Sequence, residues 1–198
     1  MNRKITIGLG FCILVLITIA ILTGFGGSDM RYQTALGDFP KLIELEKFDN
    51  LSLTIYYMNP FILTRAPLSV NDLVYGITAV NESPREKNDA NGLYEQKIVI
   101  NGSQLKEHVD LLSRIGSVNL MPIEEKSYLN ARIYYVFETE EDGKLLDVVL
   151  WGGYDDNSIY VNGIEVEGNN IFYDIIIPFL PEVSVKDLSN YLLGVWPK

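Results

Sequence analysis

The stretch from Ile5 to Gly27 carries no charged side chain, and this feature constrains the chain more than any other. A helix of about 20 residues crosses the roughly 30 Å hydrocarbon layer of a bilayer, so this stretch is long enough to span a membrane once. Arg3 and Lys4 precede it. Because positive charge flanks only this end, the positive-inside rule places residues 1–4 in the cytoplasm and residues 28–198 on the extracytoplasmic side.

A cleaved signal peptide is the alternative interpretation of the same stretch. Its most apolar part, Phe11 to Leu22, has the length of a signal-peptide core, and Gly24 and Gly26 offer a small-x-small cleavage pattern. The whole uncharged stretch is longer than most signal cores, which favours a retained single-pass anchor surrounded by the lipid bilayer at residues 5–27. Cleavage would instead release a secreted domain, so both interpretations predict export.

Composition limits what the rest of the chain does. The 198 residues suit one anchor and one domain, residues 28–198, and 47% hydrophobic residues are enough for a core. A formal charge of -10 argues against a nucleic-acid partner, because such proteins neutralise phosphates with Lys and Arg. Cys12 and His108 are the only cysteine and histidine, which excludes an intrachain disulfide and metal sites built on several thiols or imidazoles. We therefore expect no metal and no cofactor.

Residues 131–151 predict a β-hairpin with a defined register. If Glu140 to Gly143 form a four-residue loop, Thr139 lies opposite Lys144. Apolar side chains then pair on one side of the ribbon: Phe137 with Leu146, Tyr135 with Val148, and Ile133 with Leu150. A slip by one residue would move these side chains to the other side, so the apolar pattern specifies the register.

Residues 158–167 predict a second hairpin by the same reasoning. Asn162-Gly163 is the preferred pair for a two-residue type I′ turn. The turn places apolar residues opposite one another, Val161 with Ile164 and Ile159 with Val166. Residues 51–58 and 96–100 are rich in β-branched and aromatic residues and predict two further strands.

Helices are expected at two places. Asn101 and Gln104 match a capping box that would open a helix over residues 101–116, and Ser184 with Asp187 would open a second that ends at Gly194. Residues 170–177 fit either a strand or a helix. The elements together predict an α+β fold, in which the N-terminal transmembrane helix precedes one domain with a mostly antiparallel sheet and two or three helices on one face.

The side of the predicted sheet that faces away from the core carries the candidate binding residues. They are Tyr134, Glu138, Asp147, Tyr160 and Glu165. Aromatic rings on a polar sheet face supply contact area at low entropy cost. Such residues are also ordinary members of half-buried strands, so the pattern alone leaves a purely structural role open.

Catalysis is the less favoured interpretation. Glu138 and Asp147 would be diagonal neighbours about 7–8 Å apart, which overlaps the roughly 6.5–9.5 Å between the carboxyls of inverting glycosidases. Acidic pairs on a hairpin are ordinarily solvated surface, and the sequence has no nucleophile elbow. His108 is expected at the edge of the core, beside apolar helix residues.

We therefore expect a non-catalytic domain that binds an envelope protein or a polysaccharide at the bacterial cell envelope. One alternative is an acidic inhibitor or immunity-type protein, because a negative surface attracts a basic toxin or enzyme. A second alternative is a glycoside hydrolase that acts through Glu138 and Asp147.

Overall fold

The computed structural model describes most of the chain beyond its N-terminal stretch. The predicted membrane segment, residues 5–27, lies outside the described residues. None of the helices in the described part combines the length and the apolar character that crossing a membrane requires. The described ranges are residues 34–82, 95–121, 123, 129–151 and 158–194.

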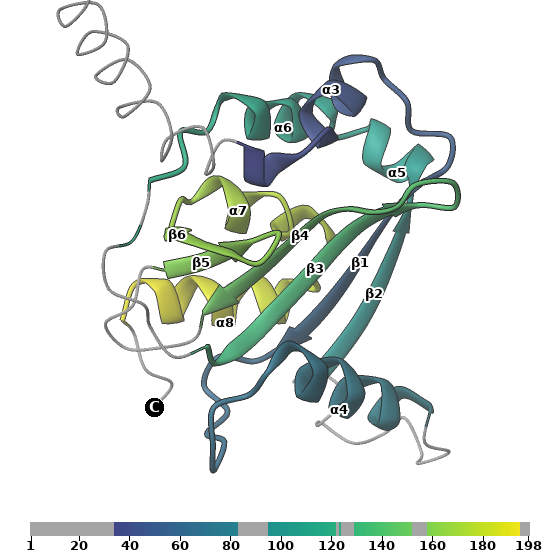
Figure 1. Cartoon of the computed structure of the whole chain (residues 1–198). Coiled ribbons are helices and arrows are strands. Elements are labelled where there is room, and N and C mark those ends of the chain that lie inside the picture. Colours follow the sequence, from purple (N-terminus) through teal and green to yellow (C-terminus); the bar gives the residue numbers. More distant parts are fainter. Residues whose placement is uncertain (1–33, 83–94, 122, 124–128, 152–157, 195–198) are drawn as a thin grey trace, which may run out of the picture.

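One antiparallel sheet organises the fold, as the alternating sequence patterns predict. Its strands lie in the spatial order β2-β1-β3-β4-β5-β6, so that β1 separates β2 from the two hairpins (Figure 1). All five neighbouring pairs are antiparallel. The strands are β1 (Leu51–Met58), β2 (Glu95–Asn101), β3 (Ala131–Thr139), β4 (Gly143–Trp151), β5 (Ser158–Val161) and β6 (Ile164–Glu167).

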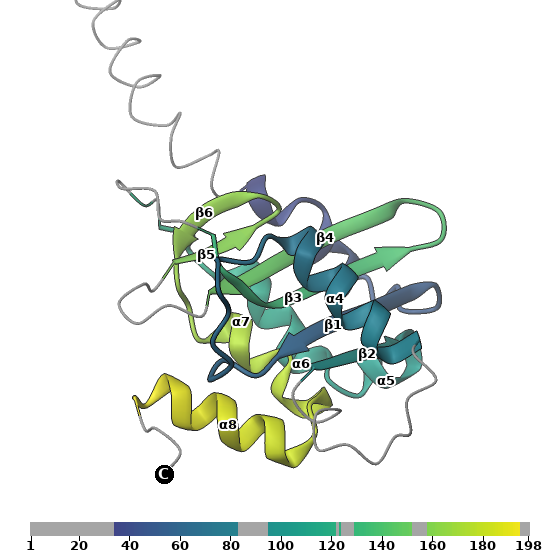
Figure 2. The same cartoon turned by 90° about the horizontal axis from the view of Figure 1, so that it is seen from below.

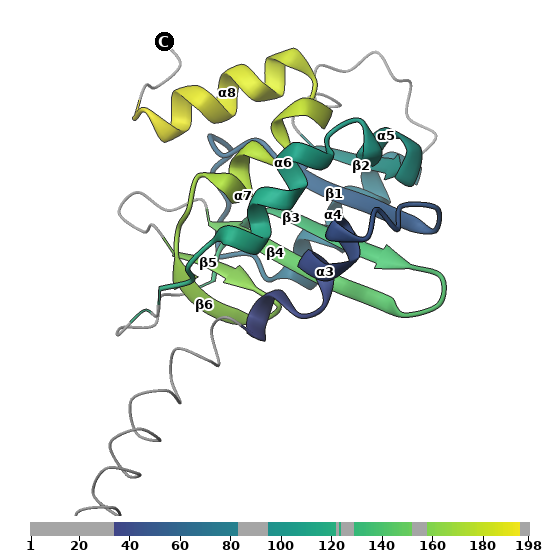
Figure 3. The same cartoon turned by 90° about the horizontal axis from the view of Figure 1, so that it is seen from above.

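Helices lie on both faces of the sheet, but very unequally. Most of them cover the face that we call the first face (Figure 3), whereas α4 (Val70–Glu82) crosses the opposite, second face (Figure 2). The α+β prediction is confirmed, but the number of helices and their restriction to one face were wrong. The elements on the first face are η1 (Thr34–Leu36), α3 (Phe39–Glu44), α5 (Gly102–Lys106), α6 (Val109–Ser113), η3 (Arg114–Ser117), α7 (Ile171–Asp174), η4 (Ile177–Phe179) and α8 (Glu182–Leu192).

The main core fills the space between the first face and its helices. The apolar residues that the two hairpin patterns place on one side are buried there, except Ile164, which is partly buried and packs against the same core. Tyr135 is fully buried, and its hydroxyl donates a hydrogen bond of 3.0 Å to the carbonyl of Phe172 in α7. The Tyr57 hydroxyl likewise donates to the carbonyl of Ser184 in α8. Each phenol thus buries a large ring without leaving its polar atom unpaired.

The first hairpin keeps the predicted register in its core and departs from it near the turn. Phe137, Tyr135 and Ile133 face their predicted partners. Thr139, however, lies opposite Gly143, and Lys144 lies opposite Glu138, because a bulge follows Phe137 along the ladder. Gly143 adopts a positive φ of 68°, which a three-residue loop with a bulge requires and which glycine supplies at little cost.

The second hairpin has the predicted register throughout. All four residue pairs match, from Val161 opposite Ile164 to Ser158 opposite Glu167. Asn162 and Gly163 have φ values of 47° and 75°, as both central residues of a type I′ turn require.

The predicted helices are present with different boundaries. The Asn101–Gln104 capping box is confirmed, but the expected helix over residues 101–116 divides into α5, α6 and η3, with His108 at the first break. Residues 170–177 form helical turns rather than a strand. The capping box at Ser184 was wrong. The extended backbone of Pro181 already starts α8, so Ser184 lies buried inside the helix.

Candidate binding surface

One continuous line of side chains crosses all six strands on the second face. The strand pairings place each member directly opposite the next, from β2 at one edge to β6 at the other. Strands lie about 4.8 Å apart, so the five intervals extend over about 24 Å. We call this line the cross-strand row. Its members are Lys97, Tyr56, Tyr134, Val149, Tyr160 and Glu165.

Ring contacts hold one half of the row in place. The rings of Tyr56 and Tyr134 stack with their centroids 5.9 Å apart and their planes 25° from parallel. The ammonium of Lys97 lies 5.6 Å from the centroid of the Tyr56 ring, within the range of a cation–π contact. Opposite charges therefore mark the two ends of the row, Lys97 at one and Glu165 at the other.

Helix α4 packs against this row and buries part of it. Leu73 and Ile77 of α4 are fully buried in a small second core that includes Val149. Tyr134 and Tyr160 pack against the same core and remain half-buried. Figure 2 shows α4 over β1, β2 and β3, whereas no described helix crosses β5 or β6 on this face. The sheet beneath the rings and α4 at one side of them thus restrict their motion.

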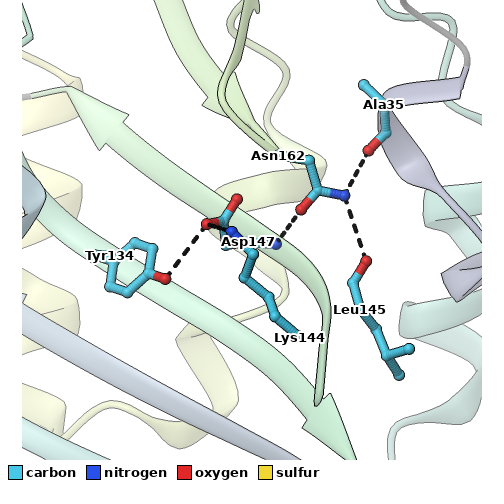
Figure 4. A network of polar contacts seen from close by, with 6 residues as sticks. All are labelled: Ala35, Tyr134, Lys144, Leu145, Asp147 and Asn162. Atoms are coloured by element: carbon cyan, nitrogen blue, oxygen red, sulfur yellow. Dashed lines mark hydrogen bonds and ion pairs between the residues drawn. The ribbon is translucent and has the colours of Figure 1, made fainter. Parts of the chain in front are cut away.

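Asp147 joins Tyr134 of the row to Lys144, which lies near the turn of the first hairpin (Figure 4). Its Oδ2 accepts a hydrogen bond from the Tyr134 hydroxyl at 3.3 Å and lies 2.7 Å from Nζ of Lys144. The ion pair exists because the bulge after Phe137 brings Lys144 and Asp147 to the same side of the ribbon. Burial, and then the Asp147 carboxylate, raise the pKa of the Tyr134 hydroxyl far above its ordinary value.

Asn162 ties the second hairpin to the bulged strand (Figure 4). Its side-chain oxygen accepts from the backbone N–H of Asp147 at 2.8 Å, and its amide donates to the carbonyls of Ala35 and Leu145 at 2.7 and 3.3 Å. A bulge leaves backbone groups outside the regular ladder, and here one turn residue satisfies two of them. Asn162 therefore serves both the turn geometry and the position of Asp147.

The structure brings the predicted residues together on one face. Tyr134, Tyr160 and Glu165 belong to the cross-strand row, and Asp147 lies two residues from Val149 along β4, on the same face. Glu138 lies closer to the hairpin tip, is exposed, and faces Lys144 across the ribbon. It thus lacks the apolar surroundings of a buried catalytic acid.

Three contributors to this surface were not predicted. Tyr56 and Lys97 belong to strands that are distant in sequence from the hairpins, and Lys144 depends on the bulge. Helix α4 also escaped prediction, although Ser69 and Asp72 match a capping pattern and their side chains and backbone N–H groups bond reciprocally.

Two further points concern the position of His108 and the side chains that could bind a metal. The His108 ring packs edge-on against Phe179 with the centroids 5.0 Å apart, at the border of the main core. Within the described ranges, no three His, Cys, Asp or Glu side chains converge as metal ligands.

Comparison with known proteins gives no relative: no protein-family description, no curated protein and no solved structure matches this chain.

Proposed function

We propose that this chain is a membrane-anchored, non-catalytic binding domain on the extracytoplasmic side of a bacterial envelope, whose second sheet face contacts another envelope protein. The observation that carries the proposal is the cross-strand row. It presents preordered tyrosines and a charge at each end along about 24 Å. Preordered aromatic residues lose little conformational entropy on binding, which makes them efficient interface anchors.

A protein partner suits the row better than a polysaccharide does. Sugar rings stack on exposed aromatic faces, but one face of Tyr56 is turned to Lys97 and the other to Tyr134. Ring edges and the exposed Lys97 side chain remain at the surface of the row. These groups favour a partner that supplies hydrogen bonds and complementary charges, as a protein surface does.

Site-specific photo-crosslinking in cells tests the binding face. A photo-reactive residue replaces Lys97 or Glu138, both exposed on the second face, in the full chain. The matched control replaces Glu107, which is exposed beside α5 on the other side of the sheet. We expect one adduct of common size from the two face positions and none from Glu107. Adducts of equal yield at all three positions would refute the proposed face.

A charge reversal tests the chemistry of the same contact. Glu165→Lys removes the negative end of the row, so the adduct from position 97 should fall several-fold. Glu107→Lys makes the same charge change away from the face and should leave the adduct unchanged. If both reversals act alike, the effect comes from net charge and the row has no specific role.

The placement across the membrane is tested separately. A reporter enzyme that is active only in the cytosol is fused to the C-terminus, after residue 198. If residues 5–27 carry the chain outward, the fusion is inactive, whereas a cytosolic reporter fused before Met1 is active. Activity of the C-terminal fusion would place the domain in the cytoplasm.

A further inference from the structure

Arg132 is a buried cation at the end of the sheet. It lies near the start of β3, where the pairing with β4 shifts between Ala131 and Ile133. Only 5% of the surface of Arg132 is exposed. Arginine is almost never buried to this extent without a carboxylate or phosphate partner, so the residue requires an explanation.

The hydrogen-bond partners of the Arg132 guanidinium in the described part of the chain are neutral. One terminal nitrogen contacts Sδ of Met58 at 3.3 Å, and the other donates to the Thr64 hydroxyl at 3.1 Å. The Nε–H is buried and has no acceptor. Throughout the described residues, no carboxylate lies within ion-pair distance of this guanidinium. Among the described residues the charge therefore has no compensating carboxylate, which is an unfavourable state for a buried group.

The segment of residues 59–68 contacts Arg132 and is held mainly at its ends. Ile62 bonds to the carbonyl of Asn59 at one end, and Leu68 bonds to the side chain of Asn130 at the other. Residues 63–67 make one hydrogen bond within the described structure, which the Thr64 hydroxyl accepts from Arg132. Leu63 is 87% exposed. A single hydrogen bond thus joins this part of the segment to the guanidinium.

The Tyr191 hydroxyl lies near Arg132, and a second cation, Arg65, belongs to the segment that contacts it. Tyr191 of α8 interacts electrostatically with Arg132, and its ring packs against Phe61 with the centroids 5.5 Å apart. Burial lowers the pKa of Arg132, and Tyr191 opposes that shift. Arg65, next to Thr64, is exposed and forms no ion pair with any described residue. Arg65 thus adds a second cation to the segment that contacts Arg132, whereas the Asp187 carboxylate is bound to Asn59 at the start of that segment.

We propose that Arg132 is the binding group of a site for a small oxyanion, the carboxylate or phosphate group of a free small molecule. The planar guanidinium matches two oxygens of either group, and the unpaired Nε–H supplies one of the two bonds. The anion compensates the buried charge, while Arg65 attracts it from solution. The ligand enters where residues 63–67 separate from the guanidinium. This site is independent of the binding face proposed above.

Thermal unfolding of the full chain in a mild detergent tests the site. Phosphate, succinate and chloride are compared at equal ionic strength, so that general salt effects cancel. At 100 times the dissociation constant, the bound anion should raise the unfolding midpoint by about 5–10 °C above that in chloride. A larger shift with phosphate assigns a phosphate ligand, and a larger shift with succinate assigns a carboxylate.

Two variants separate this site from general anion effects. Arg132→Gln should lose the anion-dependent shift, whereas Arg114→Gln should keep it, because Arg114 is exposed and already lies 3.8 Å from Asp174. Arg132→Lys keeps the charge without the planar fork and should weaken binding at least tenfold. The proposal fails if neither anion stabilises the natural chain more than chloride does. It also fails if either Arg132 variant responds as the natural chain does.

Discussion

Gly102 is the residue at which one added methyl group should damage the fold most clearly. It is the first residue of α5, directly after the Asn101 cap, and it is buried. A Cβ at this position would lie 1.7 Å from the carbonyl oxygen of Phe48 and 2.7 Å from its carbon. Both atoms belong to the backbone, so no side-chain rotation relieves the clash. Gly102→Ala therefore forces the start of α5 away from the backbone of Phe48.

The size of the effect follows from these contacts. The Cβ and the oxygen must separate by roughly 1.3 Å before their distance reaches 3.0 Å. The Phe48 carbonyl also accepts a hydrogen bond of 3.0 Å from Leu51, which the movement strains. Overpacking of this kind costs about 1–3 kcal/mol, and a weakened hydrogen bond adds about 1 kcal/mol. We expect a loss of about 3 kcal/mol and a fall in the unfolding midpoint of about 6–12 °C.

Gly76→Ala is the matched control, because it makes the same chemical change with the opposite expected sign. Gly76 lies inside α4, and a Cβ there meets no atom within 4 Å. Alanine restricts the unfolded chain and suits a helix, so this variant should gain about 0.5–1 kcal/mol. Both variants are measured as full chains by chemical denaturation and by thermal unfolding followed by circular dichroism.

The comparison of the two variants can refute the reasoning. If Gly102→Ala unfolds within about 0.5 kcal/mol of the natural chain, the close approach to Phe48 does not constrain this position. If Gly76→Ala loses as much stability as Gly102→Ala, the loss is not specific to the crowded site.

Two other predictions concern the polar groups of the fold. Asn162→Gly keeps the positive φ but loses the side-chain hydrogen bonds, so its free energy of unfolding, measured by chemical denaturation, should fall by about 1–3 kcal/mol. Asn162→Ala also places a side chain at a positive φ, so it should lose about 1 kcal/mol more. Equal stability of the two variants would contradict this order. Burial raises the pKa of Tyr173 to about 12, and it also raises the pKa values of Tyr57, Tyr134 and Tyr135 well above the usual 10. Unfolded phenols lose their protons near pH 10 while these folded ones keep theirs, so the free energy of unfolding should fall as the pH rises from about 10 to 12. Phenolate absorbance should then rise together with the loss of circular dichroism. If all tyrosines form phenolate near pH 10 while the chain stays folded, this prediction is wrong.

Most of the sheet could be predicted from local patterns. In each hairpin the two strands are neighbours in sequence, so a turn and an alternating apolar pattern suffice to define the register. The prediction failed near Thr139, where a bulge was as compatible with the residues as the regular loop. Loop length depends there on the positive φ of Gly143, which many turn types use.

Helix positions were harder to predict because burial overrides local signals. Ser184 matched a capping pattern, yet it is buried inside α8, since Pro181 already begins that helix. His108 interrupts the helix expected over residues 101–116, while Leu105, Leu112 and Ile115 stay buried on both sides of the break. The core constrains where these apolar side chains lie, and the backbone adjusts between them.

The sequence by itself determined the two hairpins, the α+β class and the division of the hairpin residues between two faces, because these properties depend on alternation over short distances. Only the tertiary structure decided that β1 lies between β2 and β3, which places Tyr56 beside Tyr134 and completes the cross-strand row. It also decided that α4 crosses the second face and that Arg132 is buried with no carboxylate of the described residues within ion-pair distance. These arrangements join residues distant in sequence, and they are selected by how whole surfaces pack rather than by any local pattern.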